Sequence, residues 1–277
     1  MDDAAARGIR AAEALAETWG STADACHALV ENEWQLATEC PGWSVKDQLS
    51  HLIAVERLLL GDAPPTWDGP LGDHVRNEFG AQLEPWIAVR RSLTGDEVLA
   101  EFRQVTALRL EALGARSAGE WAALTPSPAG GEVPYAQFME VRVFDSWVHE
   151  QDVRLALDRP GGEAGTAAGI ALDAVQKAMG YVVGKKAAAP DGTVVRFVIT
   201  GPSGAARDFS LAVEAGRASA AVGDPAPTAV LTLSAVDFTR LGCGRADAAQ
   251  IGAAGGIGME GDPVIGQAVL SQMNFMF

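Results

Sequence analysis

Apolar and polar positions follow two different periods along the chain, and the change falls near residue 190. Before it, apolar residues recur every three to four positions, as on one face of a helix. From Gly192 onward the period becomes two, which is typical of strands. The sequence therefore predicts helices over the larger, N-terminal part of the chain and a mixture of short strands and helices in the rest.

Turn and capping residues divide the helical part into segments. The first helix is expected over residues 4 to 37, with a kink favoured at Gly20-Ser21. Ser44, with Asp47 three residues later, has the pattern of a capping box that opens a second helix, and Gly61 ends it after Leu60. Further helices are predicted over 77–93, over 95–115, from Pro134 onward and over 163–186, with a long loop around 126–131.

The C-terminal part shows the alternation and the turns of a small sheet. Strands are expected over 194–200, 208–213, 217–222 and 229–233, followed by a short helix over 235–241. Asp262-Pro263 begins the last helix, and the glycines of 252–258 are interpreted as a flexible turn. The predicted fold class is α plus α+β: a four-helix bundle over 1–160, a linking helix over 161–190 and a small α+β domain over 191–277.

The composition of the chain disfavours several classes of binding partner and of cellular location. The chain has 21 Lys and Arg against 36 Asp and Glu, a net charge of −15, which disfavours nucleic acid and anionic membrane surfaces. No apolar run approaches the ~18 residues that a membrane helix needs, and the N-terminal MDDAAARGIR lacks a signal-peptide core. Three cysteines without a CxxC pair indicate reduced thiols. A cytoplasmic location is therefore expected.

Two of the four histidines stand in patterns that suit a metal ion. Asp145 and His149 are one helical turn apart, so they point the same way within about 40°. His51, in the middle of another predicted helix, would complete a set of two imidazoles and one carboxylate, as in catalytic zinc sites. Two alternatives stay open: an i,i+4 Asp–His pair on the surface, and histidines that are hydrogen-bonded residues of the core.

The other chemical groups near these residues are weaker candidates. Asp47 is expected to cap its helix, and Glu56 lies about 140° round the helix from His51. His74 lies near a loop, where we expect a solvated side chain. His27 follows Cys26 directly, and adjacent helical residues point about 100° apart, so the two do not form a catalytic pair.

Three arginines are candidates for binding a substrate carboxylate. Arg142 precedes Asp145 by three residues, Arg154 follows His149 by five, and Arg76 lies in the segment after Pro65. A guanidinium can hold a carboxylate through two parallel hydrogen bonds. The alternative for each arginine is an exposed salt bridge.

Two motifs carry a resemblance to a known family. The segment from Cys40 to Leu52, CPGWSVKDQLSHL, resembles the second-helix motif of the DinB-like bundle superfamily. The segment from Asp145 to Arg154, DSWVHEQDVR, resembles the later helix of the mycothiol-dependent maleylpyruvate isomerase family. The C-terminal part is similar to the small domain of that family, which is akin to sterol carrier proteins. The resemblance covers nearly the whole chain.

The resemblance implies a site and a reaction. It implies a divalent metal, usually zinc, held by His51, Asp145 and His149; the isomerase pattern has Glu where this chain has Asp145. It implies mycothiol as the thiol cosubstrate, activated as a metal-bound thiolate that adds to a small electrophile. The outcome would be isomerisation or transfer of the sulfur, without a protein cysteine. The alternative is a non-catalytic protein that binds or sequesters a small molecule.

Overall fold

The computed structural model describes residues 3–72, 74–75, 77–128, 130–202 and 204–276 of the chain. It divides the chain into two compact units, Met1–Gly162 and Glu163–Phe277. The helix that the sequence places between two domains belongs to the second unit in this division. Within the described residues, no helix is both long enough and apolar enough to cross a membrane.

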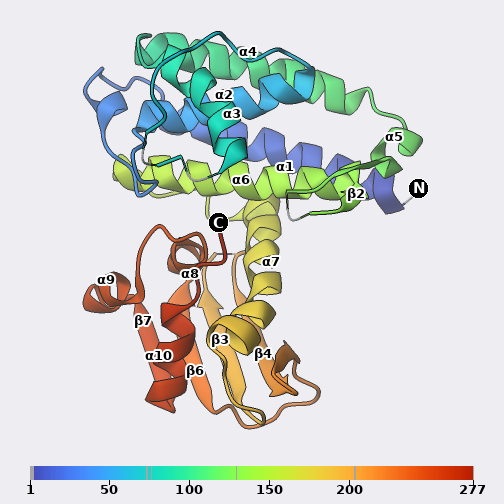
Figure 1. Cartoon of the computed structure of the whole chain (residues 1–277), viewed down its shortest axis with the longest axis vertical. Helices are drawn as coiled ribbons and strands as arrows, with labels where there is room; N and C mark the ends of the chain where they lie inside the picture. The colour runs from blue at the N-terminus through green and yellow to red at the C-terminus, as the bar shows by residue number, and fades with distance from the viewer. Residues whose placement is uncertain (1–2, 73, 76, 129, 203, 277) are drawn as a thin grey trace. The chain divides into compact units, whose positions relative to one another are not determined.

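The first unit is a helical bundle (Figure 1). Helix α1 packs on α6 and α4, and α2 packs on α3, α4 and α6. The short helix α5 lies against α1 and α6, and the short strands β1 and β2 form an antiparallel pair. The bounds are α1 Asp3–Ala25, α2 Val45–Leu60, α3 Glu78–Arg90, α4 Gly95–Gly114, α5 Ala118–Ala122, β1 Leu124–Pro126, β2 Glu132–Pro134 and α6 Tyr135–Ala156.

Helix α2 begins and ends where its sequence predicts. The Ser44 hydroxyl accepts a hydrogen bond from the Asp47 backbone N–H, and the Asp47 carboxylate accepts one from the Ser44 backbone N–H. At the other end Gly61 has a φ of 92°, in the left-handed region that glycine adopts without a steric cost. These caps fix the register of the helix that carries His51.

We expect Ser44→Ala to lower the free energy of unfolding by about 1 kcal/mol, because it leaves an N-terminal N–H of α2 without its acceptor. Urea unfolding followed by tryptophan fluorescence measures this effect in the helical unit, since all seven tryptophans lie between residues 19 and 147. An unchanged midpoint would contradict the structural role given to the capping box.

The sequence prediction was wrong about the end of the first helix. Helix α1 runs through Gly20-Ser21 but ends at Ala25, and Ala28 has a φ of 56°, which a continuing helix cannot contain. The apolar pattern continues because Trp34, in a short 3-10 helix at Glu33–Gln35, is buried. The predicted loop before α6 also contains the unpredicted helix α5 and the β1–β2 pair.

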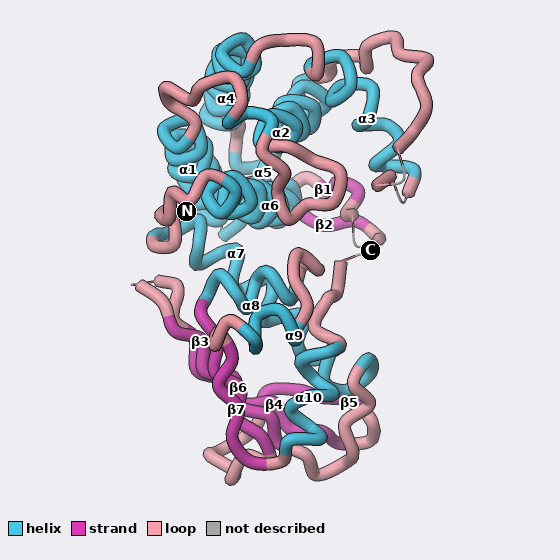
Figure 2. The backbone as a smooth tube through the Cα atoms, turned by 90° about the vertical axis from the view of Figure 1, so that its left-hand side faces the viewer, coloured by secondary structure: helices cyan, strands magenta, loops and turns pink. Residues whose placement is uncertain are grey.

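The second unit is a five-stranded sheet with helices (Figure 2). The strand order is β5-β4-β3-β6-β7; β3 pairs with β6 in parallel, and the other neighbours are antiparallel. Phe197, Phe209 and Phe238 form an aromatic cluster between the sheet and a helix. The bounds are α7 Gly165–Tyr181, β3 Val194–Thr200, β4 Arg207–Glu214, β5 Arg217–Ala220, β6 Ala229–Ser234, α8 Ala235–Gly242, α9 Ala248–Ala253, β7 Ile257–Gly261 and α10 Pro263–Ser271.

The glycine-rich segment 252–258 is not the flexible turn that its composition indicates. Helix α9 ends at Ala253, and a turn at Gly255 leads into strand β7. Strand β7 pairs with β6 through the register Leu231↔Met259. Strand β7 was not predicted because it contains two glycines and its side chains are mostly exposed. Neither its composition nor an alternation of apolar and polar residues marks it as a strand.

Candidate metal centre

His51, Asp145 and His149 meet in the first unit. His51 comes from the middle of α2, and Asp145 and His149 lie one turn apart on α6. The Nε2 atom of His51 lies 3.3 Å from Oδ2 of Asp145, and Nε2 of His149 lies 3.7 Å from Oδ1 of the same carboxylate. One ligand atom from each residue can be chosen so that all three lie within 4.8 Å of one another.

Neighbouring side chains fix the orientation of the His149 ring. Its Nδ1 atom lies 2.5 Å from Oε1 of Gln48 and 3.3 Å from Oδ2 of Asp152. The Gln48 amide is held in turn by its own hydrogen bond to the Thr38 hydroxyl. In the neutral ring, acceptors at Nδ1 keep the proton there and leave the lone pair on Nε2, which faces Asp145. This is the arrangement typical of metal-bound histidines.

His51 has the surroundings of a buried ligand. Its side chain is 7% exposed, and its Nδ1 atom is buried without a hydrogen-bond partner in the described part of the chain. The Trp43 ring covers both imidazoles, with centroid distances of 5.0 Å to His51 and 5.7 Å to His149. His51, Asp145 and His149 are called the triad below. Asp145, with 27% of its side chain exposed, is the member of the triad that solvent reaches.

A buried chain of charges holds the Asp145 carboxylate. Arg142, one turn earlier on α6, donates to Oδ2 of Asp145 at 2.6 Å and to Glu56 through two further N–H groups. Glu56, on α2, also accepts a hydrogen bond from Arg109 of α4, whose guanidinium reaches the Tyr135 hydroxyl. Glu56 is completely buried, so this series of ion pairs connects three helices of the bundle to the site.

Sequence spacing gave no signal for the roles of Glu56 and Arg109. The angle of about 140° on the helix correctly separates Glu56 from the face of His51. It does not show that Arg142 connects Glu56 to Asp145 across the bundle. The i,i+3 spacing of Arg142 and Asp145 is the only local hint of this link.

Burial and neighbouring charges shift the pKa values of the three triad residues in different directions. Burial lowers the pKa of His51 to about 4, and the attraction of Asp145 does not compensate for it. Burial also opposes the charged form of His149, but the carboxylates of Asp145 and Asp152 outweigh it and raise its pKa. Burial would raise the pKa of Asp145, yet Arg142 and the two imidazoles hold it well below its usual range.

We expect the zinc affinity of the site to increase as the pH rises from about 6 through the raised pKa of His149, because zinc must displace the proton of that ring. A raised pKa keeps that proton in place at the lower pH and releases it as pH rises. His51, with its lowered pKa, is neutral throughout this range. Calorimetric titration in buffers of different ionisation enthalpy measures the affinity and the proton release, and a pH-independent affinity would contradict the assignment.

The arginines predicted to hold a substrate carboxylate are placed as follows. Arg142 is buried, and its guanidinium is engaged by Glu56 and Asp145. Arg154 donates to Glu150, to Ser21 and to the carbonyl of Arg159. Arg76 lies outside the described residues.

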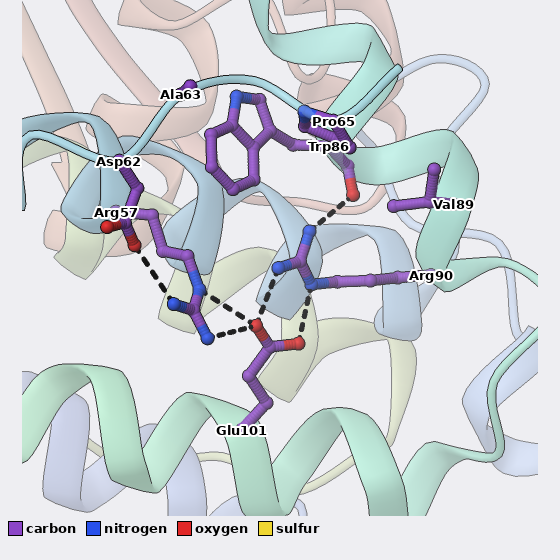
Figure 3. Close-up of a pocket in the computed structure, with 8 residues that line it drawn as sticks. All are labelled: Arg57, Asp62, Ala63, Pro65, Trp86, Val89, Arg90 and Glu101. Carbon is purple, nitrogen blue, oxygen red and sulfur yellow. Dashed lines mark hydrogen bonds and ion pairs between the residues drawn. The ribbon is translucent and has the colours of Figure 1, made fainter. Parts of the chain in front are cut away.

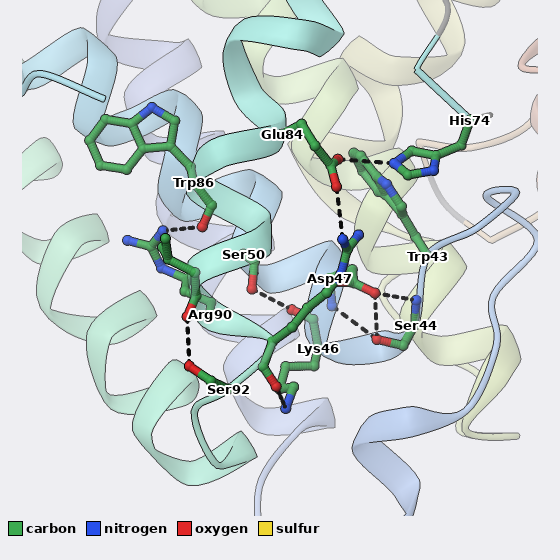
Figure 4. A network of polar contacts seen from close by, with 12 residues as sticks. Trp43, Ser44, Lys46, Asp47, Ser50, His74, Glu84, Trp86, Arg90 and Ser92 are labelled. Carbon is green, nitrogen blue, oxygen red and sulfur yellow. Dashed lines mark hydrogen bonds and ion pairs between the residues drawn. The ribbon is translucent and has the colours of Figure 1, made fainter. Parts of the chain in front are cut away.

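The expectation of a solvated His74 was wrong. Its Nε2 atom lies 2.9 Å from Oε2 of Glu84, and its side chain is only 16% exposed. The ring packs edge-on against Trp43 at a centroid distance of 6.4 Å, so it lies beside the residue that covers the triad. Loop position suggested solvent exposure, but the contact with helix α3 forms only in the folded chain (Figure 4).

A surface cavity of about 420 Å³ lies elsewhere on the bundle (Figure 3). Arg57 and Arg90 line it, and both donate to the carboxylate of Glu101. The opposite charges therefore neutralise one another inside the cavity. No member of the triad lines it.

The protein therefore belongs to a class with two units. One unit is a helical bundle with a candidate metal site of two histidines and one carboxylate, and the other is a small α+β unit. Residues 15–154 match the family model described as the mycothiol maleylpyruvate isomerase N-terminal domain, and residues 169–263 match the MDMPI C-terminal domain. The chain belongs to the mycothiol maleylpyruvate isomerase family, a family of thiol-dependent isomerases.

Solved structures agree with this fold. A crystal structure of the mycothiol-dependent maleylpyruvate isomerase has a TM-score of 0.54 and 15% identity, covering 91% of this chain and 92% of its own. A histidine-to-alanine mutant of that enzyme gives the same TM-score and coverage at 14% identity. At these identities the likeness shows the fold alone. No curated protein matches the chain significantly.

Proposed function

We propose that this protein is a metal-dependent isomerase or S-transferase that uses a low-molecular-weight thiol, mycothiol, against a small electrophile. The convergence of His51, Asp145 and His149 carries the proposal, since their ligand atoms lie within 4.8 Å of one another. Three protein ligands are the number found in catalytic zinc sites, where the fourth position is left for a reactant. Maleylpyruvate, the substrate named for the family, is the first electrophile to test.

The donor set fits a divalent ion. Two imidazole nitrogens and a carboxylate oxygen suit zinc, and the hydrogen bonds at Nδ1 of His149 favour a free lone pair at Nε2. A divalent ion bound here supplies a positive charge that favours the deprotonated form of a thiol at neutral pH.

The chain's own residues orient and shield the site. Arg142 holds the Asp145 carboxylate through Oδ2, so Oδ1 faces His149. The shorter side chain of Asp145, compared with the Glu of the isomerase pattern, still brings its carboxylate within 4 Å of both imidazoles. Trp43 covers the two rings and excludes water from that side.

An external thiol agrees with the burial of two of the protein's three cysteines, Cys26 and Cys243; Cys40 is half-buried. Burial raises the pKa of the Cys26 thiol to about 12, so it is protonated and unreactive at neutral pH. Cys243 is also buried, in the second unit. Substrate binding by Arg76, Arg142 and Arg154 stays a prediction, and the engaged donors of Arg142 and Arg154 make Arg76 the first of the three to test.

The test is turnover of maleylpyruvate by zinc-loaded protein with and without mycothiol. We expect turnover only when both zinc and mycothiol are present, and loss of turnover in His149→Ala. Stoichiometric binding of the electrophile without turnover would instead favour a sequestering protein. Equal turnover without metal or thiol would contradict the proposal.

A further inference from the structure

Gln48 connects the two helices that supply the ligands of the candidate metal centre. It is completely buried on α2, three residues before His51, so the two side chains point the same way within about 60°. Its Oε1 atom lies 2.5 Å from Nδ1 of His149, which comes from α6. One side of α2 therefore supplies one ligand of the triad and contacts another.

The other end of the Gln48 amide faces the turn that precedes α2. Its Nε2 atom donates to the Thr38 hydroxyl at 2.6 Å. The backbone N–H and the hydroxyl of Thr38 both donate to the Trp43 carbonyl, at 3.0 Å and 2.9 Å. The turn that places Trp43 over the two imidazoles is therefore also connected to His149 through Gln48.

Backbone groups determine the direction of the Thr38 hydroxyl. A hydroxyl has one proton to donate and two lone pairs that accept. The proton is donated to a backbone carbonyl, that of Trp43 at 2.9 Å, with that of Cys40 farther away at 3.5 Å. The Cys40 backbone N–H, at 3.3 Å, donates to one lone pair. A lone pair is then left for Gln48, so the amide presents its NH2 group to Thr38.

The orientation of the Gln48 amide determines the tautomer of His149. With the NH2 group toward Thr38, the amide oxygen faces Nδ1, which must then carry a proton. The Asp152 carboxylate, whose Oδ2 atom lies 3.3 Å from the same nitrogen, disfavours the reversed amide. A reversed amide would need a lone pair on Nδ1, and that lone pair would face a negatively charged oxygen. The proton on Nδ1 leaves the lone pair of the neutral ring on Nε2.

We propose that Thr38 and Gln48 are positioning residues that fix the tautomer and the ring orientation of His149 before a metal ion binds. This rests on the function proposed above, in which His149 is a metal ligand. Nδ1 donates to Gln48 in the imidazolium form and in the neutral form of the ring alike. The hydrogen bond therefore needs no rearrangement when Nε2 gives up its proton, and a site that needs no rearrangement binds more tightly.

His51 provides a comparison within the same site. Its Nδ1 atom is buried and has no hydrogen-bond partner among the described residues. The Trp43 ring contacts both imidazoles, so this contact does not distinguish them. The amide of Gln48 orients His149 and not His51. A substitution at position 48 is therefore expected to alter the ring signals of His149 more than those of His51.

The Nδ1 proton of His149 gives an NMR readout that does not depend on activity. In the zinc-loaded protein we expect its signal to exchange slowly with water, because this N–H is buried and hydrogen-bonded. Gln48→Met removes the shorter of its two contacts and should accelerate the exchange by about 10-fold. Gln48→Glu should keep the slow exchange, because a carboxylate can accept from Nδ1 in the same way. Wild-type exchange in Gln48→Met would overturn the proposal.

Zinc affinity, measured by competition with a zinc-binding dye, is the second readout. Loss of a hydrogen-bonding partner of a metal ligand costs 10- to 100-fold in typical sites, so Gln48→Met should lower the affinity by about 10-fold or more. Thr38→Val keeps the shape of the side chain without its hydroxyl and should lower the affinity by about 3-fold or more, whereas Thr38→Ser should keep the wild-type value. The matched control is Thr239→Val, which removes a buried hydroxyl of the second unit and should leave the affinity unchanged.

The outcomes separate the two proposals. A wild-type protein that binds no zinc contradicts the proposed function, and the role of Thr38 and Gln48 falls with it. Zinc binding by the wild type that Gln48→Met retains at full affinity contradicts the positioning role alone. Urea unfolding shows whether each variant is folded. If Gln48→Met does not fold, Thr38→Val and Thr38→Ser decide the question, and equal zinc affinity in these two variants would overturn the proposal.

Discussion

His149→Ala is expected to lower the zinc affinity of the protein by about 100-fold or more. Loss of a single hydrogen-bonding partner of a ligand already costs 10- to 100-fold in typical sites, and this change removes a ligand itself. The remaining pair, His51 and Asp145, comes from two different helices and cannot complete a three-ligand set. Competition with a zinc-binding dye measures the affinity, and elemental mass spectrometry measures the metal retained after purification.

Two further variants show whether the loss of zinc affinity is specific to the proposed metal ligands. His51→Ala should behave in the same way, since the site needs one ligand from α2. His27→Ala removes an exposed histidine outside the site and should keep the wild-type affinity. Full metal content in both His51→Ala and His149→Ala would rule out the triad as the metal centre.

Glu56→Ala is expected to lower the free energy of unfolding of the helical unit by about 3 to 5 kcal/mol. Glu56 is completely buried and accepts hydrogen bonds from both Arg109 and Arg142. Its removal leaves two guanidinium groups in the core without this carboxylate, and unpaired buried charges are strongly destabilising. Urea unfolding followed by tryptophan fluorescence isolates the effect, because the second unit contains no tryptophan.

The matched control is Glu111→Ala on α4, which removes an exposed carboxylate. It should change the free energy of unfolding by no more than about 0.5 kcal/mol. A loss below about 1 kcal/mol in Glu56→Ala would contradict the account, because the chain Glu56–Arg142–Asp145 would then contribute little to the fold or to the orientation of Asp145.

Local chemistry made the elements that carry the site predictable. Ser44, Asp47 and Gly61 mark the ends of α2 in the sequence, and the four-residue spacing of Asp145 and His149 places both on one face of α6. The family motifs then joined His51 to this pair. These signals are read from residues within one or two helical turns, where geometry is fixed by the helix itself.

Local sequence patterns could not predict the contacts between distant segments of the chain. Glu56 and Arg142 are 86 residues apart, and His74 meets Glu84 only because the segment before α3 folds back onto that helix. Strand β7, with its exposed side chains and two glycines, is defined by its pairing with β6 rather than by its own sequence. In each case the partner, and not the local pattern, decides the structure.

Zinc-edge anomalous diffraction from crystals grown with zinc tests the assignment of the metal centre without recourse to activity. We predict a strong anomalous peak in contact with Nε2 of His51, Nε2 of His149 and the carboxylate of Asp145, and no such peak in crystals of His149→Ala. A peak at another site, with none between these three side chains, would contradict the assignment of the metal centre and with it the proposed function.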